Sequence, residues 1–214
     1  MMEKIIGAFT FRKEVYQEVE NDTSFTPTAW MIVAVVALLS SLGSSAIAAG
    51  AAYSSGLSSG PWILGAFGSA IFAVAGFALG AFVISWAGKT FFNAETSFEE
   101  MVRVLGLAYV WNVVGFLGIL ALLGPALTCV TGPISFLAAI AGLISWFIAA
   151  KEALDLEWPQ TIGTVIIGWV VTLVVTMIAG AILGIFGLAG AGIGAVVFDE
   201  VKKGHYAYQV VFEP

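Results

Sequence analysis

The sequence predicts an all-α fold, a polytopic membrane helix bundle, and three observations support this fold class. Residues 29–187 hold long apolar runs with only three basic and six acidic side chains, all in two short gaps, Lys89–Arg103 and Lys151–Glu157. The chain is 60% hydrophobic and 10% charged, where a soluble domain has about 25% charged residues. The runs are continuous rather than alternating, which favours helices over a closed barrel as the way to satisfy backbone polar groups in lipid.

Five runs are long enough to cross a hydrocarbon core about 30 Å thick, which takes roughly 20 helical residues. The predicted spans are residues 29–52, 62–87, 102–123, 133–150 and 160–186. Proline suits the first helical position, where its missing N–H would be unpaired in any case. It marks four of the starts, at Thr26-Pro27, Gly60-Pro61, Gly132-Pro133 and Trp158-Pro159. Before the third span, a capping box is predicted instead, formed by Thr96 with Glu99 or by Ser97 with Glu100.

Residues 1–28 are predicted to form a cytoplasmic amphipathic segment ahead of the transmembrane domain, residues 29–187. Within this segment, residues 2–20 are expected to form one helix, because apolar side chains recur at helical spacing at Met2, Ile5, Ile6, Phe9, Tyr16 and Val19. Such a helix fits two interpretations. It can lie on the bilayer and fix the first span, or it can dock a cytoplasmic partner.

Residues 188–214 are predicted to be a Gly-rich exit followed by a short outer tail. The apolar stretch 160–198 is too long for one helix and barely long enough for two. A sixth short span over residues 180–198 is the alternative, and it would return Lys202 and Lys203 to the cytoplasm. Its many glycines oppose a regular helix, at about 1 kcal/mol each relative to alanine.

The orientation follows from the basic residues, which stay on the cytoplasmic side of a membrane. The N-terminal segment and the second and fourth gaps contain Lys4, Arg12, Lys13, Lys89, Arg103 and Lys151. The first and third gaps, residues 53–61 and 124–132, have no charged residue. The N-terminus is therefore predicted to be cytoplasmic and, with five spans, the C-terminus to be outside.

No catalytic, cofactor-binding or metal-binding site is predicted. Arg103 lies in the first turn of the third span, and no Asp, Glu, Lys, Arg or His lies deeper in any span. Ion-coupled carriers and proton relays place such groups at membrane depth, so the sequence argues against them. The one histidine, His205, is in the tail, and no phosphate-cradling Gly-Lys-Ser/Thr loop is present. Cys129 is the single cysteine, so no intramolecular disulfide can form.

Five residues are predicted to pack helices together. Glycines four apart permit close backbone approach, and such pairs occur at Gly76 and Gly80 and at Gly180 and Gly184. Asn112 is the most polar side chain near the centre of a span, and an interhelical hydrogen bond is its expected role. The alternative is that Asn112 binds a headgroup or a small solute.

A charged cytoplasmic rim is predicted to bind a partner protein. It consists of Lys89, Glu95, Glu99, Glu100, Arg103, Lys151, Glu152, Asp155 and Glu157. With the N-terminal segment, the cytoplasmic face has six basic and eleven acidic residues, a formal net charge of −5. This balance gives no electrostatic reason to bind nucleic acid, and it suits a basic protein surface.

Three stretches of the chain resemble the Ypt-interacting protein (Yip) family of five-span membrane proteins, in its compact prokaryotic form. They are the lead-in from Phe9, the phrase from Gly88 to Tyr109, and the phrase from Ala150 to Thr161. The resemblance implies a cytoplasmic N-terminus and an outer C-terminus. Eukaryotic members act in trafficking and contact Rab-type GTPases through a longer N-terminal region than the 28 residues present here.

The expected function is therefore that of a non-enzymatic integral membrane protein, in a prokaryotic cell membrane, that organises the bilayer or acts as an adaptor. Its expected partners are the lipid bilayer and either another membrane protein or a second copy of the chain. Two alternatives remain open. One is a passive channel or uncoupled carrier with a path lined by Asn112, Ser44, Thr172 and Thr176, and the other is an accessory subunit of a larger membrane complex.

Overall fold

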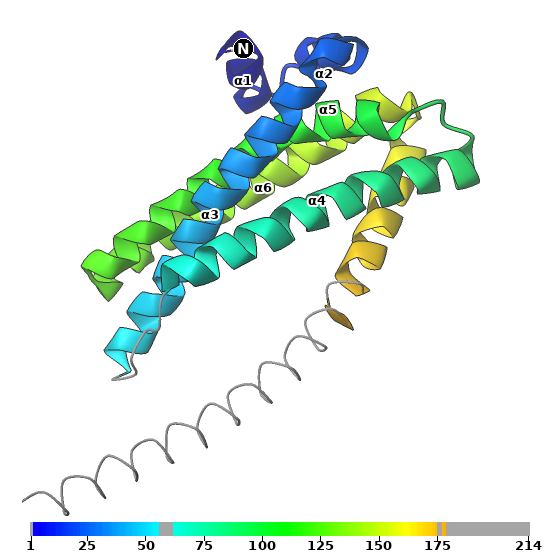
Figure 1. The fold of residues 1–214 in the computed structure, drawn as a ribbon. Helices are drawn as coiled ribbons and strands as arrows, with labels where there is room; N and C mark the ends of the chain where they lie inside the picture. The colour runs from blue at the N-terminus through cyan, green and yellow to red at the C-terminus, as the bar shows by residue number, and fades with distance from the viewer. Residues whose placement is uncertain (1, 56–61, 175–176, 179–214) are drawn as a thin grey trace, which may run out of the picture. The chain divides into compact units, whose positions relative to one another are not determined.

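The computed structural model describes residues 2–55, 62–174 and 177–178, and all regular structure in these ranges is helical (Figure 1). The chain divides into two compact units, Met1–Thr172 and Leu173–Pro214. In the second unit, the described residues 173–174 and 177–178 are helical. The bundle belongs to the first unit.

Two short helices open the chain, α1 (Met2–Phe9) and α2 (Lys13–Asn21), and a 3-10 turn, η1 (Thr23–Phe25), leads into α3 (Thr26–Ser54). After the second long helix, α4 (Trp62–Phe92), the chain turns back at residues 93–97.

The rest of the bundle begins with α5 (Phe98–Ala108), which continues without a break into a 3-10 helix, η2 (Tyr109–Leu123). A short 3-10 turn, η3 (Pro125–Leu127), leads into α6 (Thr128–Leu154). A further apolar helix covers Trp158–Val174.

The described residues contain four helices long and apolar enough to cross a membrane: Thr23–Tyr53, Trp62–Phe92, Phe98–Leu123 and Thr128–Leu154. The predicted all-α membrane bundle is confirmed for this part of the chain. The helix Trp158–Val174 is apolar but shorter, so the count of five spans stays a prediction. The segment 180–198, where a sixth span was the alternative, lies outside the described residues.

The predicted helix starts are mostly confirmed. α3 begins at Thr26 with proline in its first turn, and the last helix begins at Trp158. The Ser97–Glu100 capping box is present, and Gly60-Pro61 lies outside the described residues. The start at Pro133 is wrong. α6 begins at Thr128 and runs through Pro133, which costs one hydrogen bond near the helix start.

The single N-terminal helix predicted over residues 2–20 is also wrong, because a break at residues 10–12 divides it into α1 and α2. Phe11 has φ 56°, a left-handed conformation. The residue types that usually adopt it, glycine and asparagine, are absent from this break, so no local signal in the sequence predicts it. Lys4 links the two helices through ion pairs with Glu18, at 3.3 Å, and Asp22, at 3.1 Å. The break lets both helices fold onto the bundle.

Small residues or asparagine recur at every third position of η2 from Asn112 to Ala121, which fits its unusual 3-10 winding. Side chains three apart are eclipsed in a 3-10 helix, so every third residue lies on one ridge. In η2 that ridge consists of Asn112, Gly115, Gly118 and Ala121. At about 2.0 Å rise per residue, 15 residues extend about 30 Å, the thickness of a hydrocarbon core.

The ridge of η2 packs directly on α3, which runs beside it (Figure 1). A Cβ on Gly118 would lie 2.6 Å from the carbonyl oxygen of Gly43, and one on Gly115 would lie 3.2 Å from Ser40 Cβ. A side chain at Gly43 would collide with the carbonyl oxygen of Gly115. We call this contact the α3–η2 seam; its closeness suits a bilayer, where helices associate by van der Waals packing.

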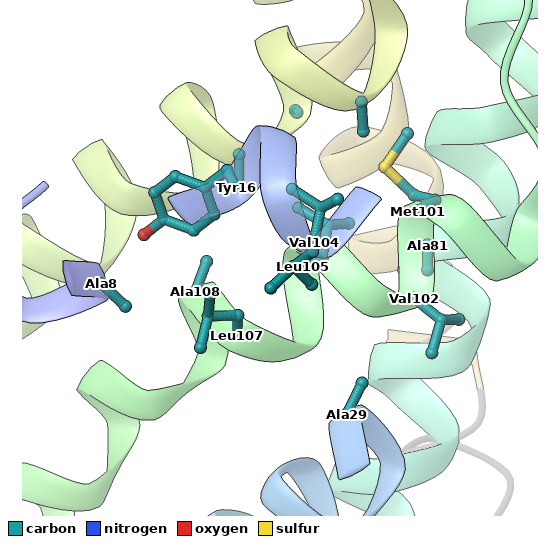
Figure 2. Packing of buried hydrophobic residues seen from close by; sticks show 14 of the residues in the cluster. Ala8, Tyr16, Ala29, Ala81, Met101, Val102, Val104, Leu105, Leu107 and Ala108 are labelled. Atoms are coloured by element: carbon teal, nitrogen blue, oxygen red, sulfur yellow. The ribbon is translucent and has the colours of Figure 1, made fainter. Parts of the chain in front are cut away.

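The largest buried side chains gather around α5. All of residues 101–108 are buried, and Met101, Val104 and Leu105 are fully inaccessible. Figure 2 shows this helix among residues of α2 and α3, with Tyr16 and Ala29 on either side. The core of the first unit therefore lies at the end of the bundle where α1 and α2 fold over it.

The outer faces of the long helices are apolar and uncovered. On α4, Phe67, Ile71 and Phe72 are 51%, 71% and 58% exposed, and α6 exposes Phe136 and Leu137. Soluble monomers rarely leave so much contiguous apolar surface uncovered. These faces are the ones that contact lipid.

Candidate functional site

The charged gaps and the N-terminal helices meet at one end of the bundle, which we call the charged end. α2 contacts both α5 and α6 there. The hydroxyls of Tyr16 and Ser145 form a buried hydrogen bond of 2.6 Å, and burial raises the pKa of Tyr16. Gln17 Nε2 also donates to Glu152 Oε2 at 2.6 Å. The N-terminal segment thus packs into the bundle in addition to any contact with the bilayer.

A capping box sets the start of α5. Ser97 Oγ accepts from the backbone N–H of Glu100 at 3.2 Å, and Glu100 Oε2 accepts from the N–H of Ser97 at 2.6 Å. The first turn of a helix favours negative charge, so Glu99 and Glu100 are also well placed electrostatically. The box occupies Glu100, whereas Glu99 points outward and is exposed.

Arg103 occupies the centre of the charged end and is only 3% exposed. Its Nε donates to the carbonyl oxygens of Val19, at 3.2 Å, and Glu20, at 3.1 Å, and its Nη2 donates to Glu20 O at 2.5 Å. Nη1 donates to Thr26 Oγ1 at 3.3 Å. Arg103 therefore caps the last turn of α2, where a positive charge also opposes the helix dipole.

This environment corrects one predicted rim residue. Arg103 was expected to be an exposed part of a partner-binding surface, but its guanidinium is buried and donates hydrogen bonds to backbone carbonyls. Replacing it would leave these acceptors uncapped inside the protein, which costs about 1–3 kcal/mol per buried group. Its role is to hold α2 against α5.

Acidic groups crowd the same place. Burial, followed by the negative charges of Asp155, Glu100 and Glu152, raises the pKa of the Glu20 carboxyl from 4.5 to about 7, although Arg103 opposes the shift. Near neutral pH, Glu20 is therefore partly protonated. The charge of Glu20 is therefore coupled to the charges of Glu100 in α5 and of Glu152 and Asp155 at the end of α6.

The remaining rim residues divide by exposure. Lys89, Glu95, Glu99, Asp155 and Glu157 are exposed, whereas Glu100, Lys151 and Glu152 are half-buried. Lys151 lies over the ring of Trp158, 5.6 Å from its centre. Both ion pairs within residues 2–55, 62–174 and 177–178 involve Lys4. We call the four exposed carboxylates the acidic rim: Glu95, Glu99, Asp155 and Glu157.

The two gaps that hold the acidic rim are packed together. A Cβ on Gly88 would lie 2.6 Å from Leu154 Cδ2 and 3.4 Å from Ala94 Cβ. The backbone N–H of Ala94 also donates to Gly88 O at 3.1 Å, which closes the turn after α4. The sequence predicted both gaps to share one face, and the structure brings them to one end.

The helix-packing predictions are partly wrong. No atom lies within 4 Å of a Cβ placed on Gly76, and at Gly80 the nearest atoms are Trp146 Cη2 at 3.7 Å and Thr172 Oγ1 at 3.8 Å. Asn112 Nδ2 donates to Tyr109 O of its own helix at 3.2 Å, which replaces the expected interhelical bond. Gly180 and Gly184 lie outside the described residues.

Backbones do come together at other glycines, among them Gly43, Gly115 and Gly118, which sequence reasoning missed. For Gly115 and Gly118, the signal was a three-residue period in the third span rather than the four-residue spacing that was sought. α4 is held differently, by Phe77, which is 3% exposed and makes edge contacts with Trp30, Tyr109 and Trp146 at 5.9, 5.3 and 6.4 Å.

Within the described ranges, no group of three or more His, Cys, Asp or Glu side chains is arranged to hold a metal ion. The long apolar helices with uncovered outer faces define an integral membrane protein of the helical-bundle class. Residues 6–180 match the family model of the Yip1 domain. The chain therefore belongs to the Yip1 domain family, as its three phrases predicted. No curated protein and no solved structure shows significant similarity to it.

Proposed function

We propose that this protein is a non-enzymatic membrane adaptor of the Yip1 domain family that docks a basic protein surface on its acidic rim. Five spans, a cytoplasmic charged end and an outer C-terminus complete the proposal, and a prokaryotic cell membrane is its proposed location. The orientation is supported by Lys4, Lys89 and Lys151, which share the charged end and would be cytoplasmic under the positive-inside rule.

One observation carries the proposal. Several charged groups at the charged end stabilise the fold: Arg103 caps α2, Glu100 closes the capping box, and Lys4 joins α1 to α2. Glu95, Glu99, Asp155 and Glu157 are exposed and have no ion pair within the part of the chain that the structure describes. An exposed acidic surface on a folded platform favours a basic partner, since complementary charge speeds association and selects partners.

A pair of matched double variants tests the docking surface. Glu95→Lys with Glu99→Lys reverses two carboxylates of the acidic rim, and Glu3→Lys with Glu14→Lys makes the same charge change on exposed positions of α1 and α2. We expect the first pair to abolish co-purification of the partner in mild detergent and the second to preserve it. Both should elute like the unmodified protein, since exposed charges contribute only about 0–1 kcal/mol to stability.

Two results would overturn this assignment. If co-purification survives reversal of the rim, the rim does not bind the partner. If it is lost only in the variant on α1 and α2, the partner docks on those helices, as in the alternative interpretation of the N-terminal segment.

Thiol labelling tests the orientation. Cys129 is exposed at the start of α6 and should react with an impermeant reagent in intact cells. A cysteine in place of exposed Thr90, in a Cys129→Ser background, should react only after the membrane is opened. Ala94 is unsuitable for this purpose because it is 7% exposed. Reaction at position 90 in sealed cells would reverse the proposed topology.

A passive channel or uncoupled carrier is the second candidate. Of the four side chains expected along its path, Ser44 and Asn112 do line one hollow. Thr172 Oγ1 instead donates to Gly168 O at 2.8 Å and lies near Gly80, and Thr176 lies outside the described residues. Solute flux through vesicles that is lost in Asn112→Leu and unaffected by reversal of the acidic rim would favour this candidate over the adaptor.

A further inference from the structure

A hollow of about 340 Å³ lies between α3, η2 and α6, at the level of the spans. Its volume is at the lower end of the range for small-ligand sites. Three helices contribute polar groups to its wall: Ser40, Ser41 and Ser44 from α3, Asn112 from η2, and Ser135 from α6. Such a concentration of hydroxyl and amide groups is unusual at membrane depth.

The wall offers both acceptors and donors of hydrogen bonds. Ser40 Oγ donates to Ala37 O at 3.2 Å, and Ser44 Oγ donates to Ser41 O at 3.1 Å, both within α3. Asn112 Nδ2 donates to Tyr109 O within its own helix. Each hydroxyl oxygen and the Asn112 carbonyl oxygen keep lone pairs for a ligand. The hydroxyls of Ser41 and Ser135 and the second N–H of Asn112 Nδ2 also provide donors, so a matching ligand both donates and accepts hydrogen bonds.

The ligand must also be uncharged. No Asp, Glu, Lys, Arg or His belongs to the wall of the hollow. A charge at membrane depth without a partner is costly, so an ammonium or phosphate group does not fit here. Hydroxyl groups satisfy both conditions, since they donate and accept hydrogen bonds and carry no charge.

A second hollow, of about 250 Å³, adjoins the first and shares Asn112 and Ala139 with it. Its wall is largely apolar and aromatic, with Tyr109, Trp146 and Trp169. Asn112 and Ala139 are both exposed at the surface of the first unit. The first hollow thus holds more polar groups than the second, and both open at the surface of the first unit.

We propose that the two hollows form one binding site for a lipid with an uncharged, hydroxyl-bearing headgroup, of the diacylglycerol kind. The headgroup hydroxyl binds the serines and Asn112, and an acyl chain lies against Tyr109 and Trp146. This site is independent of the adaptor proposal, because the hollows share no residue with the acidic rim.

Photolabelling of the full chain in phosphatidylcholine vesicles tests the site. The probe is diacylglycerol with a photoreactive diazirine in its acyl chain, and the labelled peptides are identified by mass spectrometry. We expect labelling of residues 139–146 that unlabelled diacylglycerol displaces and that excess phosphatidylcholine does not. Affinity should fall about tenfold in Ser44→Ala and in Asn112→Leu, the loss expected when a ligand hydroxyl is left unpaired.

Matched controls keep the result interpretable. Ser44→Ala changes little volume, so it remains informative if Asn112→Leu fails to fold. Ala75→Leu, on the uncovered face of α4, should leave labelling unchanged. Equal labelling by a phosphatidylcholine probe, or unchanged affinity in Ser44→Ala and Asn112→Leu, would overturn the site. Displacement by free glycerol but not by diacylglycerol would overturn the lipid assignment in favour of a free polyol.

Discussion

Helix α3 has its most extensive contacts with η2 and α4, and it packs against these two by opposite means. Toward η2 the contact depends on missing side chains, since Gly43 and Gly118 bring backbone atoms together. Toward α4 the contact depends on a large side chain, since Phe77 meets Trp30 of α3 and two further rings. α4 contains many glycines, yet Gly65, Gly68 and Gly76 have open space beside them.

The difference shows that glycine spacing alone does not identify a packing face. A glycine matters where a partner backbone lies within reach, and the helix winding decides where that happens. The pair Gly76 and Gly80 flanks Phe77 and has the spacing of a packing motif, but the aromatic side chain between them makes the contact. Four experiments break or sharpen this comparison, in decreasing order of expected effect.

Phe77→Ala should have the largest effect. It removes a buried ring and leaves a cavity among three aromatic side chains, which costs about 3–5 kcal/mol in the free energy of unfolding. Denaturation in mixed micelles measures the loss. Phe72→Ala, on the 58% exposed face of the same helix, is the matched control and should change stability little. Equal effects of the two substitutions would show that Phe77 does not anchor α4.

Gly118→Leu should destabilise the protein by about 1–3 kcal/mol, because overpacking the α3–η2 seam forces two backbones apart. The same denaturation assay applies, and a broadened elution profile should accompany the loss. Gly68→Leu adds the same side chain where nothing lies within 4 Å and serves as the control. If Gly118→Leu is as stable as its control, the seam is not a close contact.

The third test concerns the charged end, where the stability of the packing depends on the charge of Glu20. The folded state raises the pKa of Glu20 from 4.5 to about 7, so between these values it binds more protons than the unfolded state. Stability should therefore fall as pH rises through this window and stay lower above it, by about 1 kcal/mol because Glu20 is half-exposed and screened.

Thermal denaturation at pH 5 and pH 8 measures this dependence. Glu20→Gln should reduce it, whereas Glu14→Gln, at an exposed position of α2, should preserve it. The α3–η2 seam contains no titratable group, so Gly118→Leu should lower stability equally at both values. An unchanged pH dependence in Glu20→Gln would contradict the coupling.

Gly76→Leu should have the smallest effect, within about 0.5 kcal/mol, as for surface substitutions away from special features. Gly80→Leu should cost more, because Trp146 and Thr172 lie in contact distance, yet these side chains can shift. Denaturation of the two variants measures how much each glycine of the Gly76–Gly80 pair contributes to packing. A large effect at Gly76 would show that α4 meets another backbone there.

Hydropathy and charge predicted much of the fold. The apolar runs set four long helices, and the Ser97–Glu100 capping box set the start of α5. These features depend on residues near in sequence, which explains the success. The break at Phe11 was not predictable from local sequence, because it depends on the burial of Tyr16 and Val19 against the bundle. The start of α6 before Pro133 likewise follows no local signal.

For the candidate site, the sequence predicted where the charged residues lie but not what each of them does. The charged gaps do meet at one end, but sequence alone could not separate Arg103 from Glu99, since burial decides between them. Arg103 is buried because the last turn of α2 presents carbonyl oxygens to it. The serine-lined hollow was half foreseen, through Ser44 and Asn112, while Ser135 joins it only because α6 packs beside η2.

The 3-10 winding of η2 also constrains how the length of this segment can change. With about three residues per turn, inserting one residue before Gly115 would rotate the following glycines by about 120° and turn bulky neighbours toward α3. Inserting three residues would restore the ridge one turn later. We therefore expect related sequences to tolerate length differences of three in residues 109–123 and to avoid differences of one or two.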